Sequence, residues 1–430
     1  MQIDLAFGRN GLSVTLPASA RPVVVRKPKM AIPPDPAAAV AAALDRPMGT
    51  APLTQLAKGA RTACILICDI TRPVPNALFL RPLVERLTAA GVPADGITVL
   101  VATGLHRPNL GDELAELVGD PWVLDTVRVE NHYARDEAAH VHLGMTPTYG
   151  VPVGIDRRFV EADVKIATGL VEPHFMAGYS GGRKVIAPGV AHHETIRTFH
   201  SARFMEDPLA TSCNLAGNPL HEAQLEILAM LHGPVLGLNT VVDEHRNLAF
   251  VSFGDIVESH GAAVAFARAS CEAMVGRRFR TVVTTSAGYP LDKTYYQTVK
   301  GMVTPLGILE DGGTLIIASE CSEGFGSAEF REAQQRLVAL GPQAFLNTLI
   351  GKALADIDEW QTEMQLKPMR VGRIQLYAPG LGPDDRAATG VEMIDDMPAA
   401  IGAAIDRHGD GAIAVVPEGP YIVPFDRAAA

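Results

Sequence analysis

The chain of 430 residues has few cysteines and few aromatic residues, and it contains no long apolar run. Its five cysteines form neither a CxxC pair nor a zinc-knuckle spacing, which argues against a disulfide framework and against a structural zinc site. No uninterrupted apolar stretch approaches the ~18–20 residues that a membrane-spanning helix needs. The residues after Met1 do not combine a basic segment with an apolar one, as a secretory signal does. We therefore expect a cytoplasmic protein without membrane contacts.

Positive charge is in the minority, because 37 Lys and Arg stand against 48 Asp and Glu, for a formal net charge of −11. A net acidic surface argues against non-specific binding of nucleic acid. It leaves an anionic small substrate open, since a few basic side chains can dominate one cleft. Hydrophobic residues make up 47% of the chain, which is enough for a sizeable core and excludes general disorder.

The pattern of apolar runs predicts an α/β fold with mostly parallel sheets. Segments with helical spacing, such as 77–90 and 329–340, alternate with short β-type runs, which is typical of βαβ units. The predicted strands are 63–70, 96–102, 164–168, 281–285, 313–318, 373–378 and 412–416. The first 16 residues predict a β-hairpin that turns at Gly8-Arg-Asn-Gly11. A basic cluster at 277–280 follows a helical stretch, and we place a domain boundary there, between residues 1–274 and 275–430.

Polar, titratable or glycine residues follow four of these runs directly. In parallel sheets, ligands bind at the carboxyl ends of the strands, so these segments carry the functional signal. They are Asp69–Pro75, Thr103–Pro108, Gly169–His174 and Ser286–Asp292.

The segment Glu172–Gly189 is rich in small residues and contains Ser180-Gly-Gly-Arg-Lys184. Small residues allow close approach of a ligand, and backbone N–H groups can cradle a phosphate. The spacing is not that of a Walker A loop, and we find no GxGxxG fingerprint in the chain. A flexible loop with two solvated bases is the simpler alternative. A lysine beside Val-Ile-Ala is, however, also a candidate for covalent chemistry.

Four of the 13 histidines lie between residues 174 and 200, namely His174, His192, His193 and His200. Histidine is the commonest metal ligand and exchanges protons near neutral pH. HExxH is absent, and no set of carboxylates and histidines has the spacing of a self-sufficient metal site. His140 and His142 form an HxH pair that could bind a metal, although a solvated loop is the preferred interpretation.

Two further groups suit the binding of an anion. Arg72 lies three residues after Asp69 and is placed to bind a carboxylate or phosphate, although a local Arg72–Asp69 ion pair explains the spacing equally well. Tyr296 and Lys300 share one face if their segment is helical. Trp360, one of two tryptophans, stands among polar residues.

Together these segments resemble the nickel-pincer-nucleotide-dependent lactate racemase family, which comprises racemases and epimerases of 2-hydroxy acids. The resemblance rests on Asp69-Ile-Thr-Arg72-Pro-Val-Pro, Ala102-Thr-Gly-Leu-His106-Arg-Pro and the block from Glu172-Pro-His174 through Ser180-Gly-Gly-Arg-Lys184. His200, Tyr289-Pro-Leu-Asp292, Tyr296-Gln297, Lys300, Trp360 and Pro417–Tyr421 extend it over most of the chain.

The resemblance implies two α/β domains with the cofactor in a cleft between them. It implies a nickel-pincer nucleotide (the nickel complex of pyridinium-3,5-bisthiocarboxylic acid mononucleotide) attached covalently to Lys184, beside Ser180, Gly181 and Gly182. His200 would bind the nickel ion, and His106 and His174 would be the catalytic acid/base pair. The residues expected to bind the substrate or line its pocket are Asp69, Arg72, Tyr296, Gln297, Lys300 and Trp360. The expected partners are a small 2-hydroxy acid and accessory proteins that make the cofactor.

The residue types suit this chemistry. Deprotonation at C2 of a 2-hydroxy acid is slow, whereas loss of the hydroxyl proton to a neutral histidine, with transient hydride transfer to the cofactor, avoids a carbanion. Ile70 stands where we expect histidine in the lactate enzyme, so the pocket differs while the acid/base pair is retained. Two alternatives stay open: a nucleotide-dependent oxidoreductase or transferase on the same scaffold, and a non-catalytic cofactor-binding protein.

Overall fold

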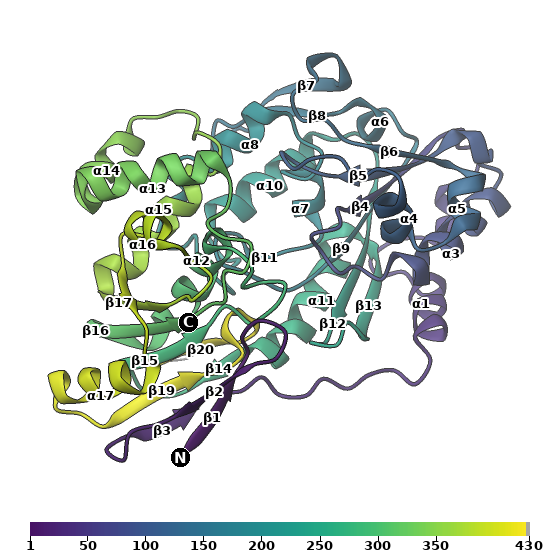
Figure 1. Ribbon diagram of the computed structural model, residues 1–430. Coiled ribbons are helices and arrows are strands. Elements are labelled where there is room, and N and C mark those ends of the chain that lie inside the picture. The colour runs from purple at the N-terminus through teal and green to yellow at the C-terminus, as the bar shows by residue number, and fades with distance from the viewer. Residues whose placement is uncertain (427–430) are drawn as a thin grey trace. The chain divides into compact units, whose positions relative to one another are not determined.

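The computed structural model describes residues 1–426, which fold into two compact units. The central unit comprises Lys29–Phe199 and Pro208–Ala269. The C-terminal unit comprises Met1–Pro28, His200–Asp207 and the chain from Ser270 onward. Figure 1 labels most of the helices and strands of both units.

The central unit is built on a six-stranded sheet with the order β13-β12-β9-β4-β5-β6. Its neighbouring strands run parallel, except for the antiparallel pair β12–β13. The strands are β4 (Ala63–Cys68), β5 (Ile97–Ala102), β6 (Arg128–Asn131), β9 (Val164–Leu170), β12 (Val235–Val242) and β13 (Leu248–Asp255). Strand β4 reads Ala-Cys-Ile-Leu-Ile-Cys and is buried almost throughout, as expected for a parallel strand covered on both faces.

Helices and small hairpins surround this sheet. Helix α3 (Asn76–Ala89) buries Phe79, Leu80, Leu83, Val84 and Leu87, whose spacing of three and four residues forms one apolar stripe. The other helices are α1 (Pro36–Asp45), α2 (Leu53–Leu56), α4 (Asp112–Val118), α5 (Pro121–Thr126), α6 (Arg157–Val160), α7 (Arg183–Ile186), α8 (His193–Phe199), α10 (Pro219–Met230) and α11 (Ile256–Cys271), with 3₁₀ turns η1 (Ala94–Gly96) and η2 (Glu137–Ala139). Two antiparallel hairpins pair β7 (His140–Met145) with β8 (Pro152–Asp156), and β10 (Pro173–His174) with β11 (Gly178–Tyr179).

The C-terminal unit has a six-stranded parallel sheet with the order β18-β17-β16-β15-β19-β3. Its strands are β3 (Arg21–Val24), β15 (Phe279–Thr285), β16 (Leu309–Ala318), β17 (Gly372–Tyr377), β18 (Glu392–Ile394) and β19 (Ala412–Val416), and a separate pair joins β14 (Glu272–Met274) to β20 (Val423–Phe425). The helices are α9 (Ala202–Met205), α12 (Tyr295–Val303), α13 (Ala328–Leu340), α14 (Pro342–Ile350), α15 (Glu359–Val371), α16 (Pro383–Ala388) and α17 (Met397–His408), with 3₁₀ turns η3 (Thr304–Ile308) and η4 (Gly419–Tyr421).

The structure confirms the α/β fold with mostly parallel sheets, and all seven predicted strands are present. The predicted N-terminal hairpin is formed by β1 (Gln2–Leu5) and β2 (Leu12–Thr15). The predicted boundary near residue 275 lies close to the division at Ser270, but the assignment of the first 28 residues to the N-terminal domain differs from the structure. They join the C-terminal unit because β3 pairs with β19 and because Ile3 and Leu5 pack into that unit's core.

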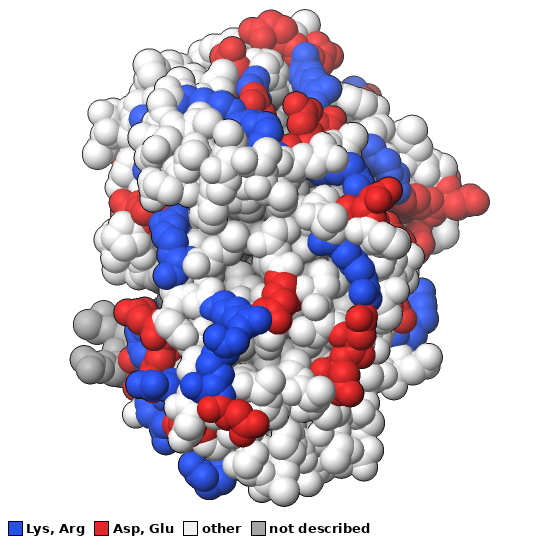
Figure 2. All heavy atoms as spheres, turned by 60° about the vertical axis from the view of Figure 1, so that its left-hand side comes forward, with Lys and Arg blue, Asp and Glu red and all other residues white. Residues whose placement is uncertain are grey.

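The surface shown in Figure 2 carries Lys and Arg side chains interspersed with Asp and Glu side chains. Among residues 1–426, no helix combines the length and the apolar character required to cross a membrane.

Candidate active site

In the central unit, the turn after β4 holds a carboxylate that orients a histidine. Asp69 is buried, and its Oδ2 lies 2.6 Å from Nδ1 of His106, which follows β5. Its Oδ1 accepts hydrogen bonds from Oγ1 and the backbone N of Thr71, at 2.5 and 3.2 Å. Burial raises the pKa of Asp69, but the hydrogen bond and charge of His106 outweigh burial and leave this pKa below its usual value. In neutral His106 the proton therefore lies on Nδ1, and Nε2 keeps its lone pair.

Arg72, three residues after Asp69, pairs with a more distant carboxylate. Its Nη1 donates to Oε1 of Glu172, and both side chains are about one-third exposed. The local Arg72–Asp69 ion pair that the sequence allowed is therefore the wrong interpretation. Ser180 holds the backbone of Glu172 in place, because Ser180 Oγ accepts from Glu172 N at 3.0 Å and Ser180 N donates to Glu172 O at 2.9 Å.

Lys184 lies on α7, half-buried, in the same unit. Desolvation lowers the pKa of its amine to about 8, and the positive charge of Arg72 contributes in the same direction. The neighbouring Arg183 is only 3% exposed and donates to the carbonyl oxygens of Ala177 and Tyr179. The alternative of a flexible loop with two solvated bases is therefore wrong.

The glycines before Lys184 are explained by packing within the protein. A Cβ on Gly181 would lie 2.6 Å from Val171 Cγ2, and one on Gly182 would lie 2.8 Å from the ring of His260. Both glycines also have positive φ, at 77° and 50°. On the side that a Cβ would occupy, these two glycines therefore face protein atoms and leave no space for a ligand. Contact of their backbone, or of Ser180, with a cofactor remains a prediction.

His174 in β10 has the opposite hydrogen-bond pattern to His106. Its Nδ1 accepts hydrogen bonds from the backbone N–H groups of Met176 and Ala177, at 3.3 and 3.1 Å. Neutral His174 therefore carries its proton on Nε2, where neutral His106 has a lone pair. The two side chains offer one proton donor and one proton acceptor.

In the C-terminal unit, three predicted residues form an aromatic group. The rings of His200 and Trp360 lie 4.5 Å apart at 39°. Trp360 is 7% exposed, and its Nε1 donates to the hydroxyl of Tyr296 at 3.3 Å. Gln361, the next residue of α15, donates to the backbone oxygen of Tyr296 at 2.7 Å. Burial raises the pKa of Tyr296, so this hydroxyl stays protonated.

Helix α12 carries the other predicted residues of this unit. Thr294 caps the helix by accepting from Gln297 N at 3.4 Å. Tyr296 and Lys300 are one turn apart on this helix, as expected, and both are partly exposed. Among residues 1–426, the buried Oε1 of Gln297 has no hydrogen-bond partner.

Two features escaped prediction from the sequence. The sequence motif that contains Glu172 predicts no role for this residue, although its carboxylate binds Arg72. His140, expected in a solvated loop, is 2% exposed in β7, while His142 pairs with Glu137 at 2.6 Å. Among residues 1–426, no group of three or more His, Cys, Asp or Glu side chains is arranged to hold a metal ion.

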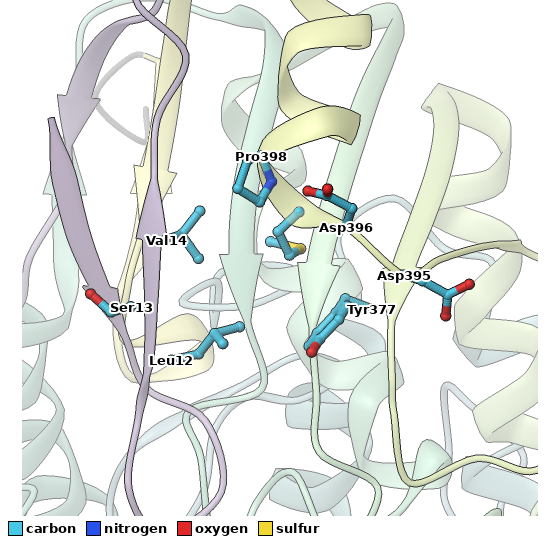
Figure 3. A pocket seen from close by; sticks show the side chains of 8 residues that line it. Leu12, Ser13, Val14, Tyr377, Asp395, Asp396 and Pro398 are labelled. Atoms are coloured by element: carbon cyan, nitrogen blue, oxygen red, sulfur yellow. The ribbon is translucent and has the colours of Figure 1, made fainter.

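The C-terminal unit also contains a small groove. Figure 3 shows Tyr377, Asp395 and Asp396 beside the N-terminal hairpin. The groove is lined by Leu12, Ser13, Val14, Tyr377, Asp395, Asp396, Met397 and Pro398. None of the predicted site residues lines it.

Comparison with known proteins covers nearly the whole chain. Residues 7–212 match the lactate racemase N-terminal domain, and residues 277–423 match the lactate racemase C-terminal domain. The lactate racemase of Lactiplantibacillus plantarum is 30% identical over 389 residues, which cover 88% of this chain and 89% of that protein. The lactate racemase of Thermoanaerobacterium thermosaccharolyticum is 31% identical over 324 residues, or 75% of this chain and 74% of that protein.

Solved structures are similar as well. The lactate racemase apoprotein from Thermoanaerobacterium thermosaccharolyticum superposes with a TM-score of 0.91 at 27% identity, covering 99% of this chain and 100% of that one. A protein from Thermotoga maritima shares the fold, with a TM-score of 0.64 at 17% identity over 92% of this chain and 99% of that one.

Proposed function

The chain belongs to the lactate racemase family and is an isomerase, and we propose that it inverts C2 of a 2-hydroxy acid with His106 and His174 as its acid/base pair. The observation that carries this proposal is the 2.6 Å contact between Asp69 and His106. It supports an imidazole that is oriented by a buried carboxylate and keeps one nitrogen available for proton transfer.

His106 acts as the base for one enantiomer. Its Nδ1–H donates to Asp69, so Nε2 takes the proton of the substrate hydroxyl. The imidazolium that results is stabilised by the Asp69 carboxylate, which is itself held by Thr71. Such a positioned general base contributes about 10²–10⁴-fold to the rate.

His174 acts as the matching acid. In its neutral form Nε2 carries the proton, because Nδ1 accepts from Met176 and Ala177. To return a proton from Nε2 to the hydroxyl oxygen when the opposite enantiomer forms, His174 must first become the imidazolium, in which Nδ1 takes up a proton and gives up its contacts with the two backbone N–H groups. When the opposite enantiomer is the substrate, the two roles exchange, so each histidine must be able to lose and gain a proton at Nε2.

The substrate carboxylate is held by Arg72 and Lys300 in this proposal. Glu172 accepts a hydrogen bond from one nitrogen of the Arg72 guanidinium, so the other N–H groups of Arg72 remain to bind a carboxylate. Tyr296, Gln297 and Trp360 line the pocket, and the unpartnered Oε1 of Gln297 supplies an acceptor for a substrate hydroxyl or a cofactor donor. Asp69, expected among the substrate-binding residues, is better assigned as the residue that orients His106, because both of its oxygens already accept hydrogen bonds.

Lys184 fits a covalently bound cofactor. With a pKa of about 8, about a tenth of its amine is uncharged at pH 7, and an uncharged amine is the nucleophilic form. We therefore propose that Lys184 carries the nickel-pincer nucleotide and that His200 is a nickel ligand. When bound, this cofactor would reversibly accept the hydride that leaves C2 of the substrate. Accessory proteins that make the cofactor are part of this proposal.

The test is an assay of protein purified from a host that makes the cofactor. A panel of single-enantiomer 2-hydroxy acids is incubated in D₂O, and stereochemistry and C2 deuterium are followed by chiral chromatography and mass spectrometry. We expect interconversion of at least one acid with its C2 hydrogen retained. Rapid deuterium uptake at C2 would contradict hydride return, and no interconversion by nickel-loaded, adduct-bearing protein would contradict the racemase assignment.

A further inference from the structure

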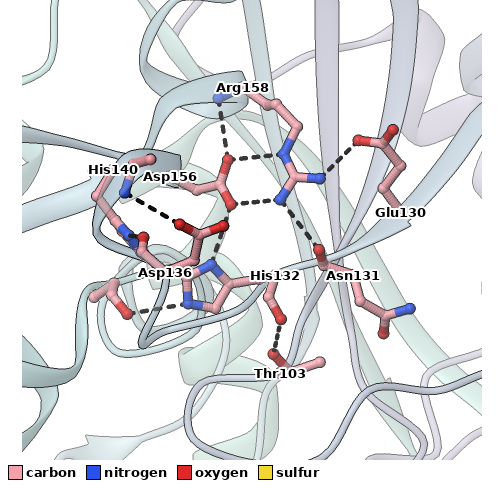
Figure 4. A network of polar contacts seen from close by, with 10 residues as sticks. Thr103, Glu130, Asn131, His132, Asp136, His140, Asp156 and Arg158 are labelled. Carbon is pink, nitrogen blue, oxygen red and sulfur yellow. Dashed lines mark hydrogen bonds and ion pairs between the residues drawn. The ribbon is translucent and has the colours of Figure 1, made fainter.

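A charged network centred on the buried side chains of His132 and Asp156, which none of the proposed catalytic roles uses, lies in the central unit (Figure 4). It consists of Glu130, His132, Asp156 and Arg158, and is called the His132 network below. Arg158 donates from Nε and Nη2 to the two oxygens of Asp156, at 2.9 and 2.6 Å, and from Nη1 to Glu130 at 2.6 Å. Although burial raises the pKa of Asp156, hydrogen bonds from Arg158 and His132 lower it to about 2.

The imidazole of His132 is fully buried and faces an acceptor on each side. Nδ1 lies 3.1 Å from Oδ2 of Asp156, and Nε2 lies 3.0 Å from the backbone oxygen of Ala191. A carboxylate and a carbonyl can only accept, so the imidazolium form alone satisfies both contacts. His132 thus joins β8 to the segment that precedes α8.

The backbone of His132 supports the turn that carries His106. Thr103 donates from Oγ1 to the backbone oxygen of His132 at 2.8 Å, and His132 N donates to Val101 O at 3.1 Å. Within the turn, His106 N donates to Thr103 O at 2.9 Å. The side chain of Thr103 therefore fixes the start of this turn to His132.

The segment that follows Lys184 is fixed to the same network. Val190 N donates to Ile186 O, so the chain after α7 continues directly from the helix of Lys184. Three carbonyls of this segment accept hydrogen bonds in turn: Gly189 from Gly104 at 2.9 Å, Val190 from Asp156 at 2.9 Å, and Ala191 from His132.

We propose that His132 is a positioning residue that fixes the His106 turn relative to the Lys184 helix. It does so because its side chain, paired with Asp156, contacts the backbone oxygen of Ala191 after that helix, while its backbone carbonyl accepts from Thr103 before His106. These contacts do not depend on the proposed function, whereas their effect on turnover rests on it. A displaced histidine is expected to lower turnover more than substrate affinity, since proton transfer depends steeply on geometry.

Thr103→Val removes one hydroxyl with little change of shape, and Thr103→Ser retains that hydroxyl. Thr88→Val is the matched control, because Thr88 on α3 also donates to backbone carbonyls, at 3.0 Å, away from the network. Asp156→Asn is a second variant, which removes the charge opposite His132 in case Thr103→Val does not fold.

The first readout is hydrogen exchange of the full, ligand-free chain, followed by mass spectrometry on peptides that cover 103–106 and 187–191. In Thr103→Val and in Asp156→Asn we expect exchange to rise about 10-fold in both segments together, and to stay unchanged in Thr88→Val and Thr103→Ser. A rise confined to 103–106, or an equal rise in Thr88→Val, would overturn the proposal.

The second readout is turnover of cofactor-loaded protein. For Thr103→Val we expect kcat to fall about 10-fold with KM within twofold of wild type, with the Lys184 adduct retained, and with recovery in Thr103→Ser. A change in KM alone would overturn the positioning role. If the chain has no racemase activity at all, the proposed function fails, while the exchange experiment still decides whether His132 couples the two segments.

Discussion

The proposed site residues of the two units differ in kind. In the central unit, Asp69, His106, Arg72 and Glu172 are ionisable residues joined in pairs, and they lie on turns that follow strands. In the C-terminal unit, His200, Trp360 and Tyr296 form an aromatic group braced by hydrogen bonds from α15 to α12. Paired charges set proton affinity, whereas rigid aromatic groups set shape. We therefore expect variants of Asp69 and His106 to change kcat and variants of Trp360 and Tyr296 to change KM.

The largest effect is expected for Lys184→Ala, which removes the amine proposed to carry the cofactor. Turnover should be abolished and intact mass should show no adduct, while the fold is retained because the Lys184 side chain is only half-buried. Lys184→Arg keeps the charge without an acylatable amine and should behave in the same way. An adduct that persists in either variant would show that attachment lies elsewhere.

Asp69→Asn should lower kcat about 10–100-fold, because it removes a charge-assisted hydrogen bond to His106. KM should change little, since the carboxylate orients the histidine and does not bind substrate. Steady-state kinetics on loaded protein measures both constants. A rise in KM at constant kcat would instead indicate that Asp69 binds the substrate.

Asp156→Asn tests stability in the central unit. Folding lowers the pKa of Asp156 from 3.8 to about 2, so the ionised carboxylate contributes about 2 kcal/mol to the free energy of unfolding above pH 4. This contribution is lost as the pH falls from 4 towards 2. Denaturant unfolding against pH should therefore show a smaller acid dependence in the variant, and an unchanged dependence would contradict the role of Asp156.

The pH dependence of Lys184 tests its electrostatic environment. The folded chain lowers the pKa of this amine from 10.5 to about 8, so labelling of Lys184 by an amine-reactive reagent should have its midpoint near pH 8. Between pH 8 and 10.5 the unfolded chain binds more protons at this residue, so its contribution to the free energy of unfolding rises with pH. A midpoint above pH 10 in labelling followed by peptide mass spectrometry would contradict this assignment.

The smallest effect is expected for Trp360→Phe, which removes the hydrogen bond to Tyr296 and keeps an aromatic ring beside His200. The free energy of unfolding should fall by about 1 kcal/mol, and KM should rise a few-fold at nearly constant kcat. Denaturant unfolding and steady-state kinetics measure these changes. A fall in kcat larger than that of Asp69→Asn would remove the distinction between the two groups.

The parallel strands were predictable because their apolar runs are continuous, as β4 illustrates. The antiparallel pair β12–β13 escaped prediction, since Gly237 and Asn239 interrupt the apolar pattern of β12. The candidate site was likewise predictable only where the local sequence carries the signal. The motif at the end of a strand indicated Asp69, whereas its pairing with His106 depends on two strands that lie side by side in the sheet.

Long-range partners were the other limit of prediction. Arg72 and Glu172 are 100 residues apart, so spacing alone could not exclude an ion pair with Asp69, three residues away. Small residues at 181 and 182 predict close approach of a ligand, whereas the atoms that crowd these glycines, on Val171 and His260, come into contact only in the fold.

The central claim, that His106 transfers a proton during inversion of a 2-hydroxy acid, is tested most directly by turnover of nickel-loaded His106→Gln. The structure predicts that this variant keeps the Lys184 adduct and interconverts the enantiomers at least 100-fold more slowly than wild type, about the lower limit for loss of a general base. Turnover by the loaded variant at the wild-type rate would contradict the claim.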